Sequence, residues 1–505
     1  MRPVDVSPAW TGLPSDRPAQ YGGPARVLVN VAAILALAAF LGVLGEVLLS
    51  ADRMRVVWPT LASTAVFACF ARIFWLRSGA YLSGEIGFVY LGLVLVYTVV
   101  PALKIVAMDF NIPLTYDQVG FAALSPTPEE LGWHCWRMVL FMAGVSAGFL
   151  VVRTRPLHGI APAEAAAQPR HRFTIAVLTA VIIGCIGLEV YLSQNAGVYV
   201  DHYTRFDHLS ESWRRFAQVA LVLKSGGYFT LLVLLFANYR EHRGLIYLLT
   251  AIFCAFEITH SLGARIEAFV IMLGVFGLYH YRVQRIGLKK GAALLVGVAL
   301  LFSLVGLVRV ANYQIGDALK YEIREESTRG SELDSVLATS FHVYQERARG
   351  TLPPRDWRLF FWEFISLVPF IDHVTYHPQY WYARHYFPGS VVPPTTLGVV
   401  AESGLWGGEP DLLVRSLLNG AIFAWLTRWF LRRRDRWWAL TVYIYCYATC
   451  VLTLKYSVLY QIIPLVRVVL PSVVLVAVLF KLEAGVNRFG GVRIAAPGPA
   501  PRATE

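Results

Sequence analysis

The sequence predicts an all-α polytopic integral membrane protein with about twelve transmembrane helices and one large outer loop that contains short helices. Three observations support this prediction. Of the 505 residues, 56% are hydrophobic and only 15% are charged, whereas a soluble globular chain carries about 25% charged residues. Stretches of roughly 20 apolar residues, long enough to cross a bilayer as helices, recur between Arg26 and Lys481. A single polar and aromatic segment, residues 311–410, interrupts them late in the chain.

The apolar stretches place the expected helices in chain order. We expect transmembrane helices 1–9 within residues 26–310 and helices 10–12 within residues 411–481. The individual spans are expected at 27–49, 56–76, 82–106, 133–152, 173–193, 215–237, 244–260, 265–281, 291–310, 411–430, 438–455 and 460–481. Residues 1–25 and 482–505 are expected to be disordered cytoplasmic tails, and the first of them lacks the apolar core of a cleavable signal peptide.

Arginine and lysine residues set the expected orientation. Basic clusters occupy the loops after even-numbered spans: Arg153, Arg155, Arg170 and Arg172; Arg240 and Arg243; Arg282, Arg285, Lys289 and Lys290; and Arg432, Arg433, Arg434 and Arg436. With an even span count these loops share one side, which the positive-inside rule makes cytoplasmic. Both termini are then cytoplasmic, and residues 311–410 face outward. The net charge of +12 therefore reflects topology, and we expect no nucleic acid as a partner.

Several chemistries have no sequence support. The six cysteines lie in or beside apolar stretches and form no CxxC pair, so they are expected to be buried as small hydrophobic residues. No P-loop, dinucleotide-binding GxGxxG, nucleophile elbow or HExxH motif occurs. His373 and His377 have a spacing that a metal could use, but no third ligand is evident. The sequence therefore predicts neither a metal site nor a cofactor.

The outer segment is dense in aromatic residues. Four of them recur at helical spacing and predict a helix on the membrane surface: Trp357, Phe360, Phe361 and Phe364. A further helix is expected at Ser331–Tyr344, packed back on the spans. Tyr376–Phe387 shows no helical stripe, so Tyr376, Tyr380 and Trp381 are the candidates for contact with sugar rings.

Arginines on the outer side oppose the usual charge bias, so some of them should have a local role. A planar guanidinium binds phosphate oxygens in bidentate fashion. The candidates for binding a pyrophosphate are Arg265, Arg309, Arg205 and Arg215. The alternative for Arg265 is an ion pair with Glu267 or Glu257 that only orients a helix end. Arg347 and Arg349 are expected on a solvated face.

Candidate acid–base residues lie near the outer ends of spans. Glu402 stands in a glycine-punctuated stretch before the tenth span and is the first candidate for a general base or an acceptor-orienting residue. His260, on one helical face with Glu257, and His373 are the next candidates.

Three of these features together resemble the oligosaccharide repeat-unit polymerases, the O-antigen (Wzy-type) polymerase family. They are Ser261-Leu-Gly-Ala-Arg265 at the start of a span, the late outer loop, and the Pro393–Gly408 stretch with its glutamate and glycines. The resemblance implies a metal-independent and nucleotide-independent glycosyltransferase of surface polysaccharide biosynthesis in the bacterial inner membrane. Such enzymes use undecaprenyl-pyrophosphate-linked oligosaccharide on the periplasmic face, among membrane lipids and with a possible chain-length regulator protein.

The resemblance also implies roles for residues of this sequence. Arg265, Arg309 and Arg205 or Arg215 would stabilise the departing pyrophosphate, and Glu402, His260 or His373 would accept the proton of the acceptor hydroxyl. Two alternatives remain open. One is an O-antigen ligase or another lipid-dependent glycosyltransferase. The other is a transporter or flippase of lipid-linked glycan, for which the mid-span charges are Arg72, Lys224 and Arg467.

Overall fold

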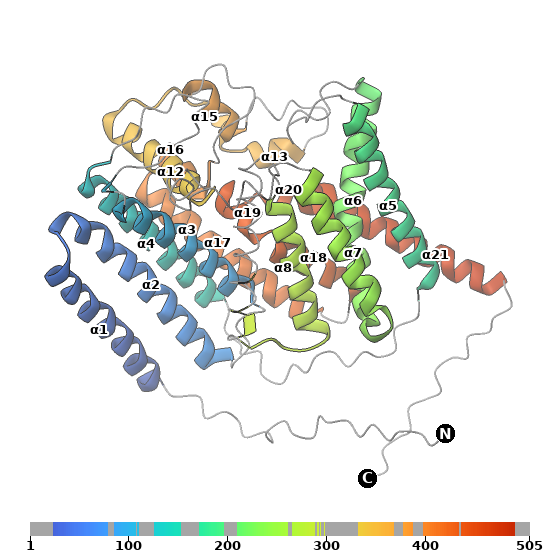
Figure 1. Cartoon of the computed structure of the whole chain (residues 1–505), viewed down its shortest axis with the longest axis horizontal. Helices are drawn as coiled ribbons and strands as arrows, with labels where there is room; N and C mark the ends of the chain where they lie inside the picture. Colours follow the sequence, from blue (N-terminus) through green and yellow to red (C-terminus); the bar gives the residue numbers. More distant parts are fainter. Residues whose placement is uncertain are drawn as a thin grey trace, which may run out of the picture.

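The computed structural model describes eleven ranges and a few positions between 290 and 297; the ranges are 24–78, 85–107, 109–110, 126–152, 171–195, 210–260, 265–287, 332–367, 377–386, 397–433 and 436–489. Within these ranges the elements are helical and no strand occurs (Figure 1). Predicted span 291–310 lies outside them except for those few positions.

The first eight helices follow the predicted spans closely. They are α1 (Pro24–Leu48), α2 (Ala51–Ser78), α3 (Ile86–Ala107), α4 (Pro128–Val152), α5 (Arg172–Asn195), α6 (Glu211–Ala237), α7 (Tyr239–His260) and α8 (Arg265–Arg282). Later in the chain, α17 (Glu409–Leu431) coincides with predicted span 411–430. Seven helical segments of the described chain are long and apolar enough to cross a membrane, in α1–α6 and at Ile462–Gly485. The protein is thus a helical multi-pass membrane protein.

The last two predicted spans are not continuous helices. Span 438–455 is divided into α18 (Trp437–Ala448) and α19 (Cys450–Lys455), with Thr449 between them. Span 460–481 consists of α20 (Ile462–Pro464), the π-helical turn η3 (Leu465–Val469) and α21 (Leu470–Phe489). Pro464 and Pro471 flank the π turn, and each lacks the N–H that a regular helix would use. The length of the apolar stretches predicted these spans, but it contains no information about breaks within a helix.

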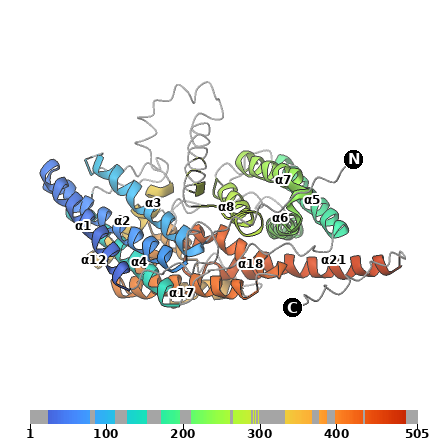
Figure 2. The same ribbon diagram turned by 90° about the horizontal axis from the view of Figure 1, so that it is seen from below.

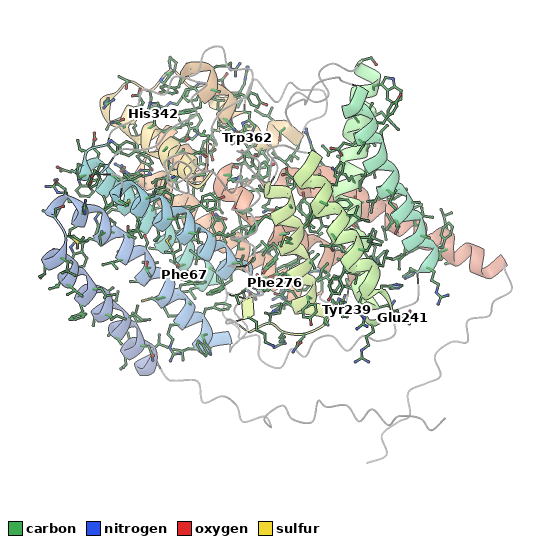
Figure 3. The ribbon with its side chains drawn as sticks, viewed as in Figure 1. Phe67, Tyr239, Glu241, Phe276, His342 and Trp362 are labelled. Atoms are coloured by element: carbon green, nitrogen blue, oxygen red, sulfur yellow. The ribbon has the colours of Figure 1, made fainter. Side chains whose placement is uncertain are left out.

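The helices form two groups, and α18 contacts both of them. Helices α1–α4 pack with α17 on one side, α5–α8 form the other group, and α18 and α21 both pack on α6 (Figure 2). Tyr239 and Glu241, at the start of α7, lie at the end opposite to His342 and Trp362 (Figure 3). Since α7 starts at that far end, its last residues and the start of α8 lie toward His342 and Trp362.

Short helices cover one end of the bundle, and we call them the loop layer. It consists of α12 (Glu332–Arg349), η2 (Trp357–Leu359), α13 (Trp362–Leu367), α15 (Pro378–Tyr386) and α16 (Val399–Leu405) (Figure 1). Helix α12 confirms the helix predicted at Ser331–Tyr344 and packs on α3 and α4. There the buried His134 ring lies 2.9 Å from the Ser340 hydroxyl.

One prediction within the loop layer was inaccurate. The surface helix expected across Trp357–Phe364 is divided between η2 and α13, although all four of its aromatic residues are exposed. The Tyr376–Phe387 segment, whose sequence shows no helical stripe, contains α15, which begins at Pro378. Proline is favourable at the first position of a helix, where no N–H is needed. Its buried side chains, among them Gln379, Trp381 and Tyr382, do not form the apolar stripe that we sought.

Helices α4 and α17 approach each other through small residues. Gly144 and Gly148, spaced as in a GxxxG motif, face Ser416 and Leu417, and Gly420 faces the backbone of Val145. A Cβ at Gly148 would overlap the carbonyl oxygen of Leu417. Small residues at this spacing let two helix backbones pack closely inside a membrane. Both helices start at the loop layer, so this contact fixes the relative positions of the two helices that support the layer.

A buried ion cluster holds the second group of helices together. The ammonium of Lys224 on α6 lies 2.7 Å from a carboxylate oxygen of Glu189 on α5 and 2.8 Å from one of Glu257 on α7. All three side chains are buried. Buried charges are stable only when they are paired with opposite charges. Removing one partner therefore leaves the remaining buried charges uncompensated. Lys224 therefore ties three helices at one point.

Replacing Gly148 tests the α4–α17 contact. Gly148→Ala should lower the free energy of unfolding by about 1–3 kcal/mol, because the new methyl group meets backbone that cannot move aside. Gly184→Ala in α5 is the matched control, since nothing lies within 4 Å of a Cβ there. Thermal unfolding in lipid nanodiscs, followed by intrinsic fluorescence, measures both variants. Equal melting temperatures for the two would contradict the close packing.

Replacing Lys224 tests the ion cluster. Lys224→Met should destabilise the protein by about 3–5 kcal/mol, because two buried carboxylates lose their shared cation. The triple variant Lys224→Met, Glu189→Gln, Glu257→Gln should recover much of this loss, since no charge then remains in the cluster. The same unfolding measurement applies, and a triple variant less stable than the single one would exclude this explanation.

Candidate functional site

The centre of the candidate site is α16, a short helix that is buried along its whole length. Its seven residues pack between α12, α17 and α19. The sequence Val-Val-Ala-Glu-Ser-Gly-Leu supplies apolar and small side chains on every face, so the helix can be enclosed. The exception is Glu402, whose side chain is only 1% exposed. A carboxylate this deeply enclosed needs a specific partner or a specific use.

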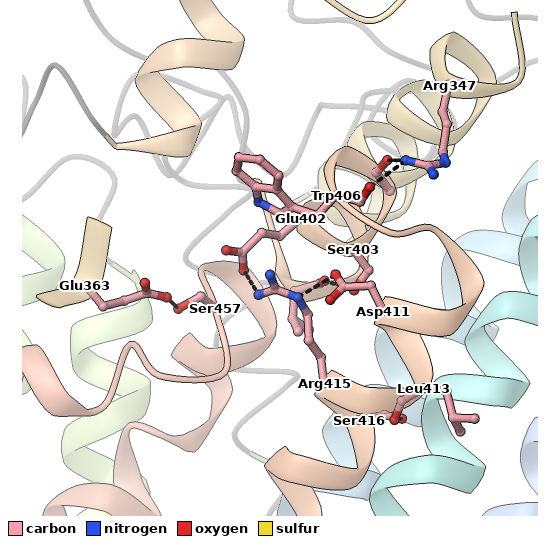
Figure 4. Close-up of polar contacts among 12 residues, drawn as sticks. Arg347, Glu363, Glu402, Ser403, Trp406, Asp411, Leu413, Arg415, Ser416 and Ser457 are labelled. Atoms are coloured by element: carbon pink, nitrogen blue, oxygen red, sulfur yellow. Dashed lines mark hydrogen bonds and ion pairs between the residues drawn. The ribbon is translucent and has the colours of Figure 1, made fainter. Parts of the chain in front are cut away.

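The partner of Glu402 is Arg415, in the second turn of α17. An Arg415 guanidinium nitrogen lies 2.9 Å from Glu402 Oε2, and the Arg415 Nε lies 2.7 Å from a carboxylate oxygen of Asp411 (Figure 4). Neither carboxylate oxygen of Glu402 has a hydrogen-bond donor in good geometry among the described residues. The contact with Arg415 is therefore an ion pair, and Glu402 retains capacity to accept hydrogen bonds from a ligand.

A second buried carboxylate approaches from α13. Glu363 is 3% exposed, and the Ser457 hydroxyl, in the turn between α19 and α20, donates a hydrogen bond to it (Figure 4). Glu402 and Asp411 pair with Arg415, and the charge of Glu363 also acts on this guanidinium. The site carries excess negative charge if all three carboxyl groups are ionised.

The electrostatics of the site favour a protonated Glu402. Burial raises the pKa of Glu402 to about 8; Arg415 opposes this shift, while the nearby charges of Glu363 and Asp411 add to it. Burial also raises the pKa of Glu363, and its hydrogen bond from Ser457 opposes that shift. A carboxyl group with a pKa near neutrality can hold or release a proton under ordinary conditions, which is the property of an acid–base catalyst.

Arg347 and Gly408 hold the end of α16. The Arg347 guanidinium donates hydrogen bonds to the carbonyl oxygens of Gly404, at 3.1 Å, and Trp406, at 2.9 Å. These carbonyls have no partner within the helix, so a cation here stabilises its C-terminus. Gly408 takes φ 70° directly before α17, a conformation that favours glycine. The expectation of a solvated Arg347 was wrong, because the residue instead caps a buried helix.

The loop layer and the spans meet at a further ion pair. Arg137 of α4 lies 2.7 Å from Glu409 in the first turn of α17, and its guanidinium stacks over the Tyr344 ring of α12 at 4.3 Å. An anionic side chain in the first helical turn also interacts favourably with the helix dipole. Arg137 therefore links three elements around the same base.

The predicted site residues fall into three groups. Glu402, Tyr380 and Trp381 lie in the loop layer with their side chains described. His260 ends α7, Arg265 begins α8 and Arg215 lies in α6, where only the backbone is described. Arg205, Arg309, His373 and Tyr376 lie outside the described residues.

The two described aromatic candidates differ in their surroundings. Trp381 is buried, and its indole N–H donates to the Pro354 carbonyl oxygen at 3.3 Å, which indicates a packing role. Tyr380 is half-buried, and its ring lies 5.6 Å from that of His377. The assignment of sugar contact to these residues stays a prediction.

Sequence reasoning missed Arg415, Asp411 and Glu363. Asp411 and Arg415 are four residues apart at the start of the tenth predicted span, a spacing typical of a helical ion pair. That spacing was visible, but it does not reveal that Glu402 would complete the cluster. Glu363 was obscured by the aromatic residues on either side of it, and no periodicity singled it out.

No metal site accompanies this cluster: within the described ranges, no group of three or more histidine, cysteine or acidic side chains is arranged to hold a metal ion. Comparison with models of protein families, with curated proteins and with solved structures finds no match for this chain. Any assignment of function therefore rests on the chemistry of the site itself.

Replacing Arg415 tests the charge balance of the site. Arg415→Met should destabilise the protein by about 3–5 kcal/mol, because buried carboxylates lose their cation. Adding Glu402→Gln to this variant should restore part of the stability, and the double-mutant cycle should give a coupling of at least about 1 kcal/mol. Arg358→Met is the control, since that arginine is exposed and its contact with the Asp356 carboxylate is long, at 4.0 Å. Additive effects of the two site substitutions would contradict the ion pair.

Proposed function

We propose that this protein polymerises polyprenyl-pyrophosphate-linked oligosaccharide repeat units at the membrane face that carries the loop layer. In this proposal that face is the periplasmic side of a bacterial inner membrane, and both termini are cytoplasmic. The observation that carries the proposal is the buried carboxyl group of Glu402, paired with Arg415 where the loop layer meets the spans. In this proposal the reducing end of the lipid-linked glycan lies at the level of Glu402.

The proposed reaction exchanges one C–O bond for another. A hydroxyl oxygen of the incoming repeat unit attacks the anomeric carbon of the growing chain, and the bond from that carbon to the lipid pyrophosphate breaks. The proton of the hydroxyl moves to Glu402, and the pyrophosphate leaves with the electron pair. A positioned base of this kind typically contributes about 10²–10⁴-fold to the rate.

Arg415 suits this role as a positioning cation. It orients the Glu402 carboxylate, and it partly offsets the negative charge that Glu402 acquires when it is ionised. Arg265, Arg309, Arg205 and Arg215 remain the proposed cations for the leaving pyrophosphate. Arg265 begins α8 directly after α7 ends at His260, and both positions lie at the loop-layer end of the bundle.

The mid-span charges disfavour the transporter alternative. Such a protein would expose charged groups to a central pathway. Lys224 is instead enclosed by Glu189 and Glu257, Arg72 donates to the Asn30 side chain at 3.1 Å, and Arg467 donates to the carbonyl oxygen of Ser366. These cations serve contacts between helices. A ligase or another lipid-dependent glycosyltransferase differs from a polymerase in its product, which the experiment below resolves.

The test uses the purified protein in nanodiscs with lipid-linked repeat units extracted from cells that lack it. A ladder of repeat lengths supports the polymerase, whereas a single capped product on another acceptor indicates a ligase. Glu402→Gln should lower the rate about 10²–10⁴-fold, and Glu402→Asp should retain part of it. Glu129→Gln is the matched control, because Glu129 is exposed and pairs with Arg55 on the same face. Full activity in Glu402→Gln would exclude Glu402 as the base.

The pH profile follows from the raised pKa of Glu402. The base must be ionised, so kcat/KM for the acceptor should rise about tenfold per pH unit below pH 8 and level off above it, given a pKa of about 8. Initial rates between pH 6 and pH 10 measure this profile. A rate that falls as pH rises through this range would assign Glu402 the opposite role, that of a proton donor.

A further inference from the structure

A cluster of rings lies beside Glu363, and we call it the aromatic cluster. It gathers residues from three separate segments: Trp362, His377, Tyr380, Tyr456 and Tyr460. The Trp362 and His377 rings are 4.2 Å apart, and Tyr456 stacks on Tyr460 at 4.4 Å. Trp362 also contacts Tyr460 at 6.3 Å between ring centroids. Segments distant in sequence thus contribute to one aromatic surface.

Hydrogen-bonding groups lie next to the aromatic cluster in the chain. Glu363 follows Trp362 in α13, and its partner Ser457 follows Tyr456. The backbone N–H of Gln379 donates to Nδ1 of His377, which leaves the ring proton on Nε2. Desolvation lowers the pKa of His377 to about 4, so the ring is neutral near pH 7. A carboxylate and a neutral imidazole donor therefore adjoin the rings.

One buried donor in the cluster has no partner within the described part of the chain. Trp362 is 5% exposed, and its indole N–H has no hydrogen-bond acceptor among the residues that the structure describes. An unsatisfied buried donor costs free energy that packing alone does not recover, and native proteins contain few of them. A tryptophan that served only to fill space would be better placed with its N–H bonded, as that of Trp381 is to Pro354. The Trp362 N–H is thus available to a ligand.

We propose that the aromatic cluster, with Glu363 and Ser457, is a subsite for one neutral pyranose ring of the acceptor glycan. The C–H face of the sugar lies on the rings, its hydroxyls donate to Glu363, and a ring or hydroxyl oxygen accepts from the Trp362 N–H. The assignment of the bound sugar to the acceptor rests on the proposed function. It follows from the position of the cluster next to the carboxylates around Arg415. The binding of the ring itself stands on the cluster alone.

The charges of the site define the kind of sugar. Glu363 lies beside the aromatic cluster, and when it is ionised it brings a negative charge to the subsite. A uronic acid would bring a further carboxylate into this surrounding and be repelled. A neutral hexose or an N-acetylated hexosamine carries no such charge, and its hydroxyls donate to carboxylates. The subsite therefore selects against acidic sugars.

Saturation-transfer NMR on the full-length protein in nanodiscs tests this subsite without any need for turnover. The probes are the methyl pyranosides of glucose, galactose and N-acetylglucosamine, with methyl glucuronide as the acidic comparison. At least one neutral pyranoside should receive saturation on its ring protons, and the glucuronide should bind at least about tenfold more weakly. If no neutral pyranoside binds, or if the glucuronide binds best, the subsite is disproved.

Conservative variants locate the binding. Trp362→Phe keeps an aromatic ring and removes the indole N–H. The affinity for the neutral pyranoside should therefore fall about threefold to tenfold, the range expected for one neutral hydrogen bond. Glu363→Gln should lower the affinity for the neutral pyranosides by a similar factor. It should also reduce the difference in affinity between these pyranosides and methyl glucuronide. Trp357→Phe is the matched control in the neighbouring η2 turn, because Trp357 is 65% exposed. Unchanged affinity in both Trp362→Phe and Glu363→Gln would overturn the assignment.

The subsite and the proposed function fail separately. If the wild-type protein forms the product ladder but pyranoside binding ignores Trp362 and Glu363, the polymerase stands and the subsite is wrong. If pyranosides bind in a Trp362-dependent manner but no ladder forms, the subsite stands and the polymerase is wrong. If both hold, Trp362→Phe should raise the KM for the acceptor and leave the KM for the donor unchanged.

Discussion

The ion pair between Arg415 and Glu402 is the contact on which the site depends. A carboxylate enclosed in α16 could not remain there charged without a cation, and the second turn of α17 supplies that cation. Asp411, four residues earlier in α17, pairs with the same guanidinium, so Arg415 has little freedom to move. The contact therefore does two things. It binds the loop layer to the bundle, and it sets the direction in which Glu402 points.

The helices beneath this contact provide its precision. α17 can present Arg415 at a fixed height because Gly148 and Gly420 allow it to lie directly against α4. α4 in turn fixes α12 through His134 and Ser340, and Arg347 of α12 caps the end of α16. These contacts form a closed circuit that leads from α16 through α17, α4 and α12 back to α16. A site assembled from loop segments thus has the support of packed helices, which hold catalytic groups better than loops do.

Much of this fold could be predicted from apolar length alone, because a membrane requires helices and each helix needs about 20 residues to cross. α1–α8 and α17 therefore coincide with predicted spans. The break at Thr449 and the π turn after Pro464 could not be predicted in the same way, since local geometry within an apolar run does not change its composition. In the site, Glu402 stood out as an acidic residue among glycines. Its partner Arg415 is thirteen positions later in a different helix, and only tertiary packing brings the two together.

The charges of the site imply that the acceptor and the leaving pyrophosphate are bound at different places in the proposed reaction. Glu402, Asp411 and Glu363 suit an acceptor whose hydroxyls donate hydrogen bonds, but when ionised they would repel a pyrophosphate. The leaving group must then be held by cations outside this cluster. The proposed candidates Arg215 and Arg265 belong to α6 and α8, in the other group of helices, at a distance along the fold from α16. In the proposed reaction the growing chain would then lie between the acidic cluster around Arg415 and these arginine positions of the other helix group. The bond to the donor's pyrophosphate would break beside these arginines, while Glu402 takes the proton of the acceptor hydroxyl.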